Sequence, residues 1–292
     1  MTSKTLNKTQ RAAVEATDGP VLIFAGAGSG KTRVLTHKMY HLIKEKQFKP
    51  ENILSVTFTN KAAKEMKERV MELLKEKDLP ITIGTFHSVC ARLLRIESIH
   101  LNISPNFAIY DVQDQKDLLK VILKNLNIPK DQLSPNNIRN QISYLKNKMI
   151  SPSSQLRKAR TVIEKKIVDV YSEYQKALKE NEALDFDDLL LKPLELFDEH
   201  PKILKKYQNK WKYILVDEYQ DTNRPQFLFL TRLAEKNKQI SVVGDDDQSI
   251  YGWRGADVTN ILDFEKSFPS CQIFTLEKNY RSTQQILDAA TA

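Results

Sequence analysis

The stretch AGAGSGKT at residues 25–32 constrains the fold more than any other part of the sequence. It follows the short apolar run PVLIFA (20–25) and opens a helical stretch from Lys31 to about Ile43. Small residues let backbone N–H groups wrap a phosphate, and the positive end of the following helix points at the same place. A strand, a glycine-rich turn and a helix in this order predict a phosphate-binding loop on a parallel sheet.

The residue types of this loop predict separate roles. The Lys31 ammonium would reach the terminal phosphates, and the Thr32 hydroxyl would bind magnesium. Ala25 stands where the usual pattern has its first glycine. The backbone expected to cradle the phosphates is that of Ala27, Gly28, Ser29 and Gly30.

Further patterns extend this interpretation along the chain. Residues 60–77 place apolar side chains on one helical face. Apolar runs with the character of buried strands recur at ILSVTFT (53–59), ITIGTF (81–86), YILVDE (213–218), ISVVGD (240–245) and CQIFTL (271–276). Alternating strands and helices imply parallel strands joined by right-handed crossovers.

The middle of the chain differs, because residues 112–182 carry helical periods and no convincing strand. NIPKDQLSPNN (127–137) and ISPSS (150–154) interrupt those periods. We therefore expect one α/β domain in two pieces with an all-helical insertion. The predicted domains are 1–110, the insertion 111–182, 183–280, and the start of a further domain at 281–292.

The charge distribution leaves two interpretations open. The net charge is +8, and residues 120–180 hold 13 Lys and Arg against 5 Asp and Glu, which accounts for the whole surplus. Such a segment has either solvated helix faces or a surface that meets a polyanion such as nucleic acid.

Other features exclude whole classes of protein. No apolar run approaches the ~20 residues that span a bilayer, and the polar N-terminus lacks a signal peptide. The two cysteines, Cys90 and Cys271, lie far apart and are expected to be buried and reduced, and no zinc spacing occurs. These features favour a cytoplasmic protein without membrane partners.

Two carboxylates end the run YILVDE. A phosphate loop that uses magnesium needs a strand-end aspartate to hold the metal, which would be Asp217. The next carboxylate, Glu218, can activate a water for attack on a terminal phosphate. Acidic strand ends are also common without any such role, but the phosphate loop makes a shared site the better interpretation.

The stretch GDDDQSIYGWRG (244–255) combines two chemistries. Asp245 would lie near the magnesium, and the Gln248 amide can donate to the terminal phosphate or its water. Tyr251, Trp253 and Arg254 suit stacking on the bases of single-stranded nucleic acid. The alternative is that both rings belong to the core, since tryptophan is usually well buried.

A set of motifs in order resembles the N-terminal part of superfamily 1 DNA helicases of the UvrD/Rep/PcrA type, over nearly the whole chain. They are LNKTQ (6–10), AGAGSGKT (25–32), TFTNKAAKEM (57–66), GTFHS (84–88), LDFDDLL (184–190), VDEYQD (216–221), GDDDQSIYGWRGA (244–256) and LEKNYRS (276–282). The resemblance implies a RecA-like P-loop NTPase sheet that uses ATP and Mg²⁺. It also implies binding to single-stranded DNA and single/double-strand junctions, with 3′ to 5′ movement.

The resemblance also implies roles for single residues. Gln10, Arg33 and Tyr280 would contact the adenine, and Arg281 would approach the γ-phosphate as a catalytic group beside Lys31, Asp217, Glu218 and Gln248. The DNA-contacting residues would be Phe58, Asn60, Thr85, His87, Tyr251, Trp253 and Arg254.

Two other functions fit part of the same pattern. One is the motor part of a recombination helicase–nuclease subunit, and the other is a DNA- and nucleotide-binding module without turnover. The sequence stops at RSTQQILDAATA without a helix-capping signal, where the family's second motor domain would begin. We therefore expect these 292 residues alone to bind nucleotide weakly and to hydrolyse it very slowly.

Overall fold

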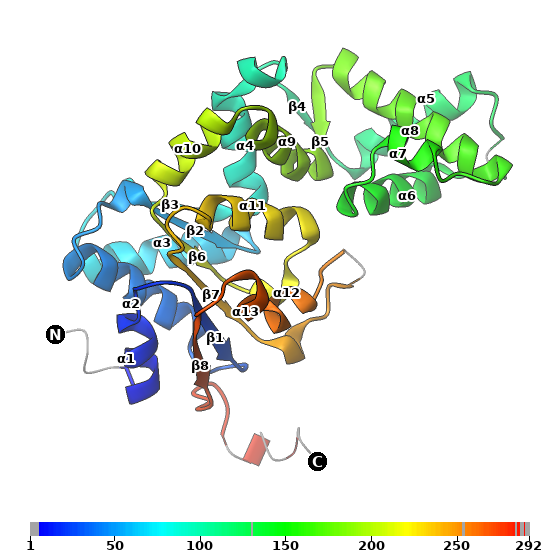
Figure 1. Ribbon diagram of the computed structural model, residues 1–292. Helices are drawn as coiled ribbons and strands as arrows, with labels where there is room; N and C mark the ends of the chain where they lie inside the picture. Colours follow the sequence, from blue (N-terminus) through cyan, green and yellow to red (C-terminus); the bar gives the residue numbers. More distant parts are fainter. Residues whose placement is uncertain (1–5, 130, 253–254, 284, 287–288, 290–292) are drawn as a thin grey trace. The chain divides into compact units, whose positions relative to one another are not determined.

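The computed structural model describes residues 6–129, 131–252, 255–283, 285–286 and 289. The chain divides into two compact units, and each is treated by itself (Figure 1). Unit 1 comprises Met1–Val89 and Lys202–Ala292, and unit 2 comprises Cys90–Pro201. Unit 2 thus interrupts unit 1 in sequence, which agrees with the insertion predicted above in kind.

Unit 1 contains a six-stranded parallel sheet in the order β3-β2-β6-β7-β1-β8. The strands are β1 (Val21–Ala25), β2 (Ile53–Thr57), β3 (Thr82–Thr85), β6 (Tyr213–Val216), β7 (Ile240–Gly244) and β8 (Gln272–Leu276). The central strands β2, β6 and β7 are buried along their whole length. This burial explains why their sequences are continuous apolar runs and do not alternate with polar residues.

Helices cover both faces of this sheet (Figure 1). On one face α2 and α3 pack into a core with alternate strand residues such as Val21, Ile23 and Leu215. Figure 1 shows α11, α12 and α13 on the opposite side of the sheet. The helices are α1 (Lys8–Glu15), α2 (Lys31–Lys44), α3 (Asn60–Leu74), α10 (Pro201–Lys210), α11 (Arg224–Ala234), α12 (Thr259–Leu262) and α13 (Phe264–Ser267), with short 3-10 turns η2 (Pro50–Asn52), η4 (Tyr219–Asp221) and η5 (Asp246–Gln248).

Unit 2 is built mainly of helices around its own core, which includes Leu119, Ile138 and Tyr174. Its elements are α5 (Val112–Asn125), α6 (Pro135–Asn147), α7 (Pro152–Leu156), α8 (Val162–Glu180), α9 (Phe186–Glu199), η3 (Ser98–Leu101) and the strands β4 (Ala108–Tyr110) and β5 (Ala183–Asp185). Helix α4 (Phe86–Ile96) begins in unit 1 and ends in unit 2. Within 112–129 and 131–182 every regular element is a helix.

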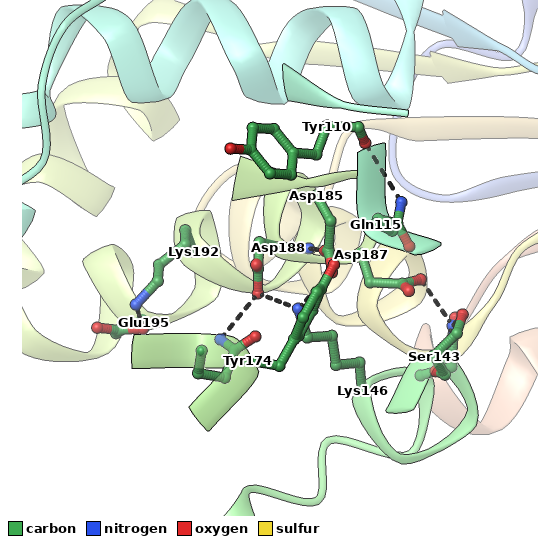
Figure 2. Close-up of polar contacts among 12 residues, drawn as sticks. Tyr110, Gln115, Ser143, Lys146, Tyr174, Asp185, Asp187, Asp188, Lys192 and Glu195 are labelled. Carbon is green, nitrogen blue, oxygen red and sulfur yellow. Dashed lines mark hydrogen bonds and ion pairs between the residues drawn. The ribbon is translucent and has the colours of Figure 1, made fainter. Parts of the chain in front are cut away.

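A buried ion cluster fixes α6 against the start of α9 in unit 2 (Figure 2). The Lys146 ammonium lies 2.7 Å from Oδ2 of Asp185 and 2.8 Å from Oδ1 of Asp188. The Tyr174 hydroxyl donates to the same Asp185 oxygen at 3.0 Å, and Asp185 also caps α9. Asp187 accepts a hydrogen bond from Nδ2 of Asn147 at 2.9 Å. The LDFDDLL stretch therefore has a packing role within unit 2.

The expected α/β class with a parallel sheet and a helical insertion is confirmed. Unit 2 is wider than the 111–182 range, because β4 and β5 pair with each other and bring their flanking segments into the unit. Three-residue strands carry too short a pattern to be recognised in the sequence. The four-part domain division remains a prediction. Cys90 is buried as expected, whereas Cys271 is only half-buried.

Candidate functional site

The loop between β1 and α2 takes its shape from two glycines. Gly28 and Gly30 have φ angles of +75° and +93°, which side chains of L residues rarely adopt. A Cβ on Gly28 would lie 2.6 Å from Oδ1 of Asn279, and one on Gly30 would lie 3.0 Å from Nε2 of Gln10. Gly30 is the N-cap of α2 and has no side chain that could cap it. The free N–H groups at the start of α2 therefore suit an anion.

A closed ring of hydrogen bonds, the polar ring, joins this loop to the ends of β6 and β7. The Lys31 ammonium donates to Oε2 of Glu218 at 2.9 Å and to Oε1 of Gln248 at 3.4 Å. Gln248 donates to Oδ2 of Asp245, whose backbone N–H donates to Oε1 of Gln220 at 3.0 Å. Gln220 closes the polar ring by donating to Oε2 of Glu218 at 2.9 Å. The ring thus forms where the neighbouring strands β6, β7 and β1 end, which is the usual ligand position in a parallel sheet.

The backbone at Glu218 adopts a conformation that a non-glycine residue seldom takes. Its φ and ψ are 50° and 48°, in the left-handed region, which costs about 1–2 kcal/mol. The Glu218 N–H donates to Oδ1 of Asp217 at 3.1 Å, and the Asp221 N–H donates back to the Glu218 carbonyl at 3.0 Å. This turn after β6 directs the Glu218 side chain to Lys31.

Two carboxyl groups near Glu218, those of Asp217 and Asp221, have raised pKa values, so their ionised forms are disfavoured when no ligand is bound. Burial, together with the charge of Glu218, raises the pKa of Asp217 to about 7. The same two causes raise the pKa of Asp221 to about 6. Oδ1 of Asp221 has no hydrogen-bond partner among the described residues. Buried carboxylates of this kind are stabilised when a cation comes near.

Magnesium fits this arrangement. Asp217 is 5% exposed at the end of β6, and Thr32 is half-buried in the first turn of α2. The described residues contain no group of three or more His, Cys, Asp or Glu side chains that could hold a metal ion. Mg²⁺ bound to a nucleotide uses one or two protein ligands and takes the rest from phosphates and water, so no such cage is needed.

Helix α1 and the segment after β8 meet at the other side of the glycine loop. Gln10 donates from Nε2 to the Ser29 carbonyl at 2.9 Å and accepts the Asn7 N–H at 3.1 Å, which caps α1. The Tyr280 N–H donates to the Gly28 carbonyl at 2.9 Å, and its hydroxyl accepts from Nδ2 of Asn7 at 2.9 Å. The residues predicted to contact adenine, Gln10 and Tyr280, therefore both lie against the glycine loop.

Asn279 fixes the segment that carries Arg281. Its Nδ2 donates to the Ala27 carbonyl at 2.7 Å, and its Oδ1 accepts the Arg281 N–H at 2.8 Å. The backbone at Arg281 is therefore attached to the glycine loop, while the side chain is exposed. Arg33 is half-buried in the first turn of α2.

The residues predicted to contact DNA follow the strands next to this site. The rings of Phe58, after β2, and Tyr251 stack with centroids 4.9 Å apart and planes at 28°. Thr85 ends β3, the neighbour of β2, and His87 follows it in α4, where burial lowers the His87 pKa. Asn60 is exposed at the start of α3. Trp253 and Arg254 lie outside the described residues.

Sequence reasoning missed the roles of two residues in the site. Gln220 and Asn279 both stand inside recognised motifs, but the residue types alone assign them no chemistry. Each contacts a main-chain group of a distant segment, Gln220 the Asp245 N–H and Asn279 the Ala27 carbonyl, and Gln220 also contacts the nearby Glu218 carboxylate. An amide at a strand end or in a loop was the available signal, and it is too common to be specific.

Fold and site together define a RecA-like α/β protein with a phosphate-binding loop. The UvrD/REP helicase N-terminal domain family matches residues 6–269. This match covers most of the chain, and the chain belongs to that family.

Among known proteins the chain is similar to bacterial relatives named ATP-dependent DNA helicase PcrA. It is 50% identical over 285 residues to the protein of Staphylococcus aureus (strain Mu50 / ATCC 700699) and to that of Bacillus subtilis (strain 168). Each alignment covers 98% of this chain and 39% of the relative. The chain thus spans about two fifths of the length of the curated relatives it matches. Among the described helices, none combines the length and the apolar character needed to cross a membrane.

Proposed function

We propose that this chain is the N-terminal motor portion of an ATP-dependent DNA helicase or translocase. The observation that carries the proposal is the 2.9 Å contact between Lys31 of the glycine loop and Glu218 at the end of β6. It brings a phosphate-binding cation and a potential general base into one site, although 187 positions separate them in the sequence. The relatives are ATP-dependent DNA helicases by name, which supports the same activity, and movement from 3′ to 5′ is proposed from family resemblance.

ATP would bind along the glycine loop. Backbone N–H groups of residues 27–30 and the start of α2 would hold its phosphates. Lys31 would exchange its contact with Glu218 for the terminal phosphates. Tyr280 and Arg33 would flank the adenine, and the Gln10 amide would bind its edge.

Thr32 and Asp217 would hold a magnesium ion. When bound, the ion neutralises charge on the phosphates as the terminal bond breaks. The buried Asp217, whose pKa is raised, suits this role because a cation favours its ionised form.

Hydrolysis would depend on three side chains around the terminal phosphate. Glu218 would accept a proton from the attacking water, a contribution of ~10²–10⁴ in rate. Gln248 would donate to the phosphate or to the same water. Arg281 would stabilise the charge that develops, since arginines in this role contribute ~10³–10⁵.

DNA would bind beside this site, over the ends of β2 and β3. Phe58 and Tyr251 offer flat rings on which bases can stack, each worth ~1–3 kcal/mol. Trp253 and Arg254 are assigned here from the sequence alone. Asn60, Thr85 and His87 would contact the strand from the adjoining segments. The expected ligands are single-stranded DNA and single/double-strand junctions.

The test is steady-state ATP hydrolysis by the protein that contains this chain, with and without single-stranded DNA. DNA should raise the turnover, and Lys31→Ala should abolish it by weakening nucleotide binding. DNA and nucleotide binding without turnover would favour a binding module instead. DNA cleavage by the same protein would favour the helicase–nuclease alternative.

A further inference from the structure

Gln220 is a member of the polar ring that has no place in the chemistry above. It lies in η4, two residues after Glu218, and is 1% exposed. A side-chain amide buried this deeply needs partners for both its oxygen and its nitrogen. The described structure supplies both, and the two partners come from different strands.

The partners fix which way the amide points. Oε1 of Gln220 accepts the backbone N–H of Asp245 at 3.0 Å, and a main-chain nitrogen can only donate. Nε2 then faces the acceptors, Oε2 of Glu218 at 2.9 Å and, more weakly, Oδ2 of Asp221 at 3.4 Å. A rotated amide would place donor against donor, so this orientation is the stable one.

Close packing holds the amide in this position. A Cβ on Gly244 would lie 2.7 Å from Oε1 of Gln220 and 2.6 Å from Cδ1 of Ile261. Gly244 at the end of β7 thus packs closely against the amide oxygen of Gln220, and any side chain at position 244 would displace it. Its burial and its hydrogen bonds to both partners make Gln220 the direct contact between the ends of β6 and β7.

We propose that Gln220 is a positioning residue that sets the Glu218 carboxylate for catalysis and connects it to the segment 245–251. The inference rests on the proposed function, because it gives Glu218 the role of general base. Both hydrogen bonds found on the Glu218 side chain, from Lys31 and from Gln220, fall on Oε2. The other oxygen, Oε1, is therefore the one that accepts the proton of the attacking water.

The connection reaches the DNA-contact residues through the backbone. Asp245 begins the segment that leads through Gln248 to Tyr251, and Tyr251 stacks on Phe58. DNA that moves Tyr251 displaces the Asp245 N–H, and Gln220 passes this displacement to Glu218. Gln220 is in this way a physical link between DNA binding and hydrolysis.

Two substitutions separate the two ends of the amide. Gln220→Met keeps the length of the side chain and removes both hydrogen bonds. Gln220→Glu keeps an acceptor for the Asp245 N–H but replaces the donor to Glu218 with a second carboxylate. Gln208→Met is the matched control, because Gln208 is also a buried amide of unit 1, 6% exposed, and donates to the Arg232 carbonyl at 2.7 Å.

The measurements are kcat and KM for ATP with and without single-stranded DNA, and the melting temperature. We expect Gln220→Met to lower the DNA-stimulated kcat by about 10- to 100-fold, part of the ~10²–10⁴ of a positioned base. KM and melting temperature should match those of Gln208→Met. Gln220→Glu should lose as much kcat although it keeps the Asp245 contact.

Glu218→Gln is measured in parallel. It shows whether a negative result contradicts the positioning role of Gln220 or the proposed role of Glu218 as general base. Wild-type kcat in both Gln220 variants, with Glu218→Gln inactive, would overturn the positioning role alone. An equal loss of kcat in Gln208→Met would also overturn it, since the effect would then be general destabilisation. Wild-type turnover in Glu218→Gln would instead overturn the proposed function of Glu218. If Gln220→Met does not fold, the result for Gln220→Glu decides.

Discussion

Lys31 and Lys146 are both paired with carboxylates, but their surroundings are opposite. The Lys31 and Glu218 side chains are 11% and 32% exposed, and their further ring partners are the amides of two glutamines. The Lys146 side chain is fully buried, between Asp185 and Asp188 at 2% and 3% exposure (Figure 2). The Lys31–Glu218 pair is accessible and can exchange its contacts for a ligand, whereas Lys146 and its two aspartates are closed off from solvent.

Electrostatics reinforce this difference. Burial lowers the pKa of Lys146, but the charges of Asp185 and Asp188 outweigh it, so the net effect is a raised pKa. The Lys146 ammonium is thus committed to its carboxylates. Near Lys31 the balance is the reverse. Burial raises the pKa of the Asp217 carboxyl to about 7, because the charge of Lys31 does not outweigh it. A site whose charges are incompletely compensated is stabilised when it binds a charged ligand, and this distinguishes the surroundings of Lys31 from those of Lys146.

The largest effect is expected at the Lys31–Glu218 pair, which is partly exposed. Glu218→Gln keeps the shape of the side chain but cannot accept a proton from water, so hydrolysis should fall by ~10²–10⁴. Nucleotide binding and melting temperature should change little, because an amide still accepts from Lys31 and the pair is partly exposed. Rapid-mix turnover and nucleotide titration check both points, and turnover at the wild-type rate would remove Glu218 from the mechanism.

Removing the charge of the fully buried Lys146 should lower the stability of the protein and should not change the rate of hydrolysis. Lys146→Met leaves Asp185 and Asp188 buried without their cation, which should cost about 3–5 kcal/mol of unfolding free energy. Denaturant unfolding followed by circular dichroism measures the loss. A variant as stable as the wild type would show that water already compensates these carboxylates.

Asp187, which is next to Asp188 in the sequence, makes the stability of the protein depend on pH. Burial and the charge of Asp185 raise its pKa to about 6, so the folded protein binds its proton more tightly than the unfolded chain does. Stability from this group is therefore present at low pH and is lost as pH rises through about 4 to 6. Asp187→Asn keeps an acceptor for Asn147 and should raise stability by about 1–2 kcal/mol above that window. Melting curves on both sides of the window test this, and a gain confined to low pH would contradict it.

The smallest effect is expected at a partly exposed pair of unit 2. Lys192 lies 2.7 Å from Oε2 of Glu195, with side chains 26% and 42% exposed. Because such pairs are screened by water, Lys192→Met should change the unfolding free energy by less than about 1 kcal/mol. Measured beside Lys146→Met, it is the control for removing one lysine charge. A loss as large as that of Lys146→Met would show that charge alone, and not burial, decides.

The sequence predicts the parts of unit 1 that local patterns encode. The apolar runs around residues 21, 53, 82, 213, 240 and 272 are strands, and the class of fold is confirmed. The phosphate loop is recognisable because glycine is required where φ is positive, as at Gly28 and Gly30. Lys31 and Glu218 are predictable as one site because their residue types complement each other and both follow strands of the same parallel sheet.

What the sequence does not predict depends on contacts between distant segments. The Asn279 side chain binds the Ala27 carbonyl 252 positions away, and no local period records such a bond. The sequence predicts Lys146 to be part of a basic, helical surface, but the side chain is fully buried against two aspartates. Charge counts treat every lysine alike, so they overstate the basic surface of this segment wherever a lysine is compensated internally.

The strand order of unit 1 bears on how the chain folds during synthesis. Strand β1 pairs with β7 and β8, which are made more than 200 residues later, whereas β2 has only β3 as a neighbour from the first segment. The helices of residues 90–201 pack with partners close in sequence, so they can assemble while the ribosome is still working. We expect residues 90–201 to fold before the sheet of unit 1 is complete, and the apolar β1 to wait unpaired until β7 and β8 emerge. A nascent chain in this state exposes a bare strand edge, which makes it a natural client for chaperones.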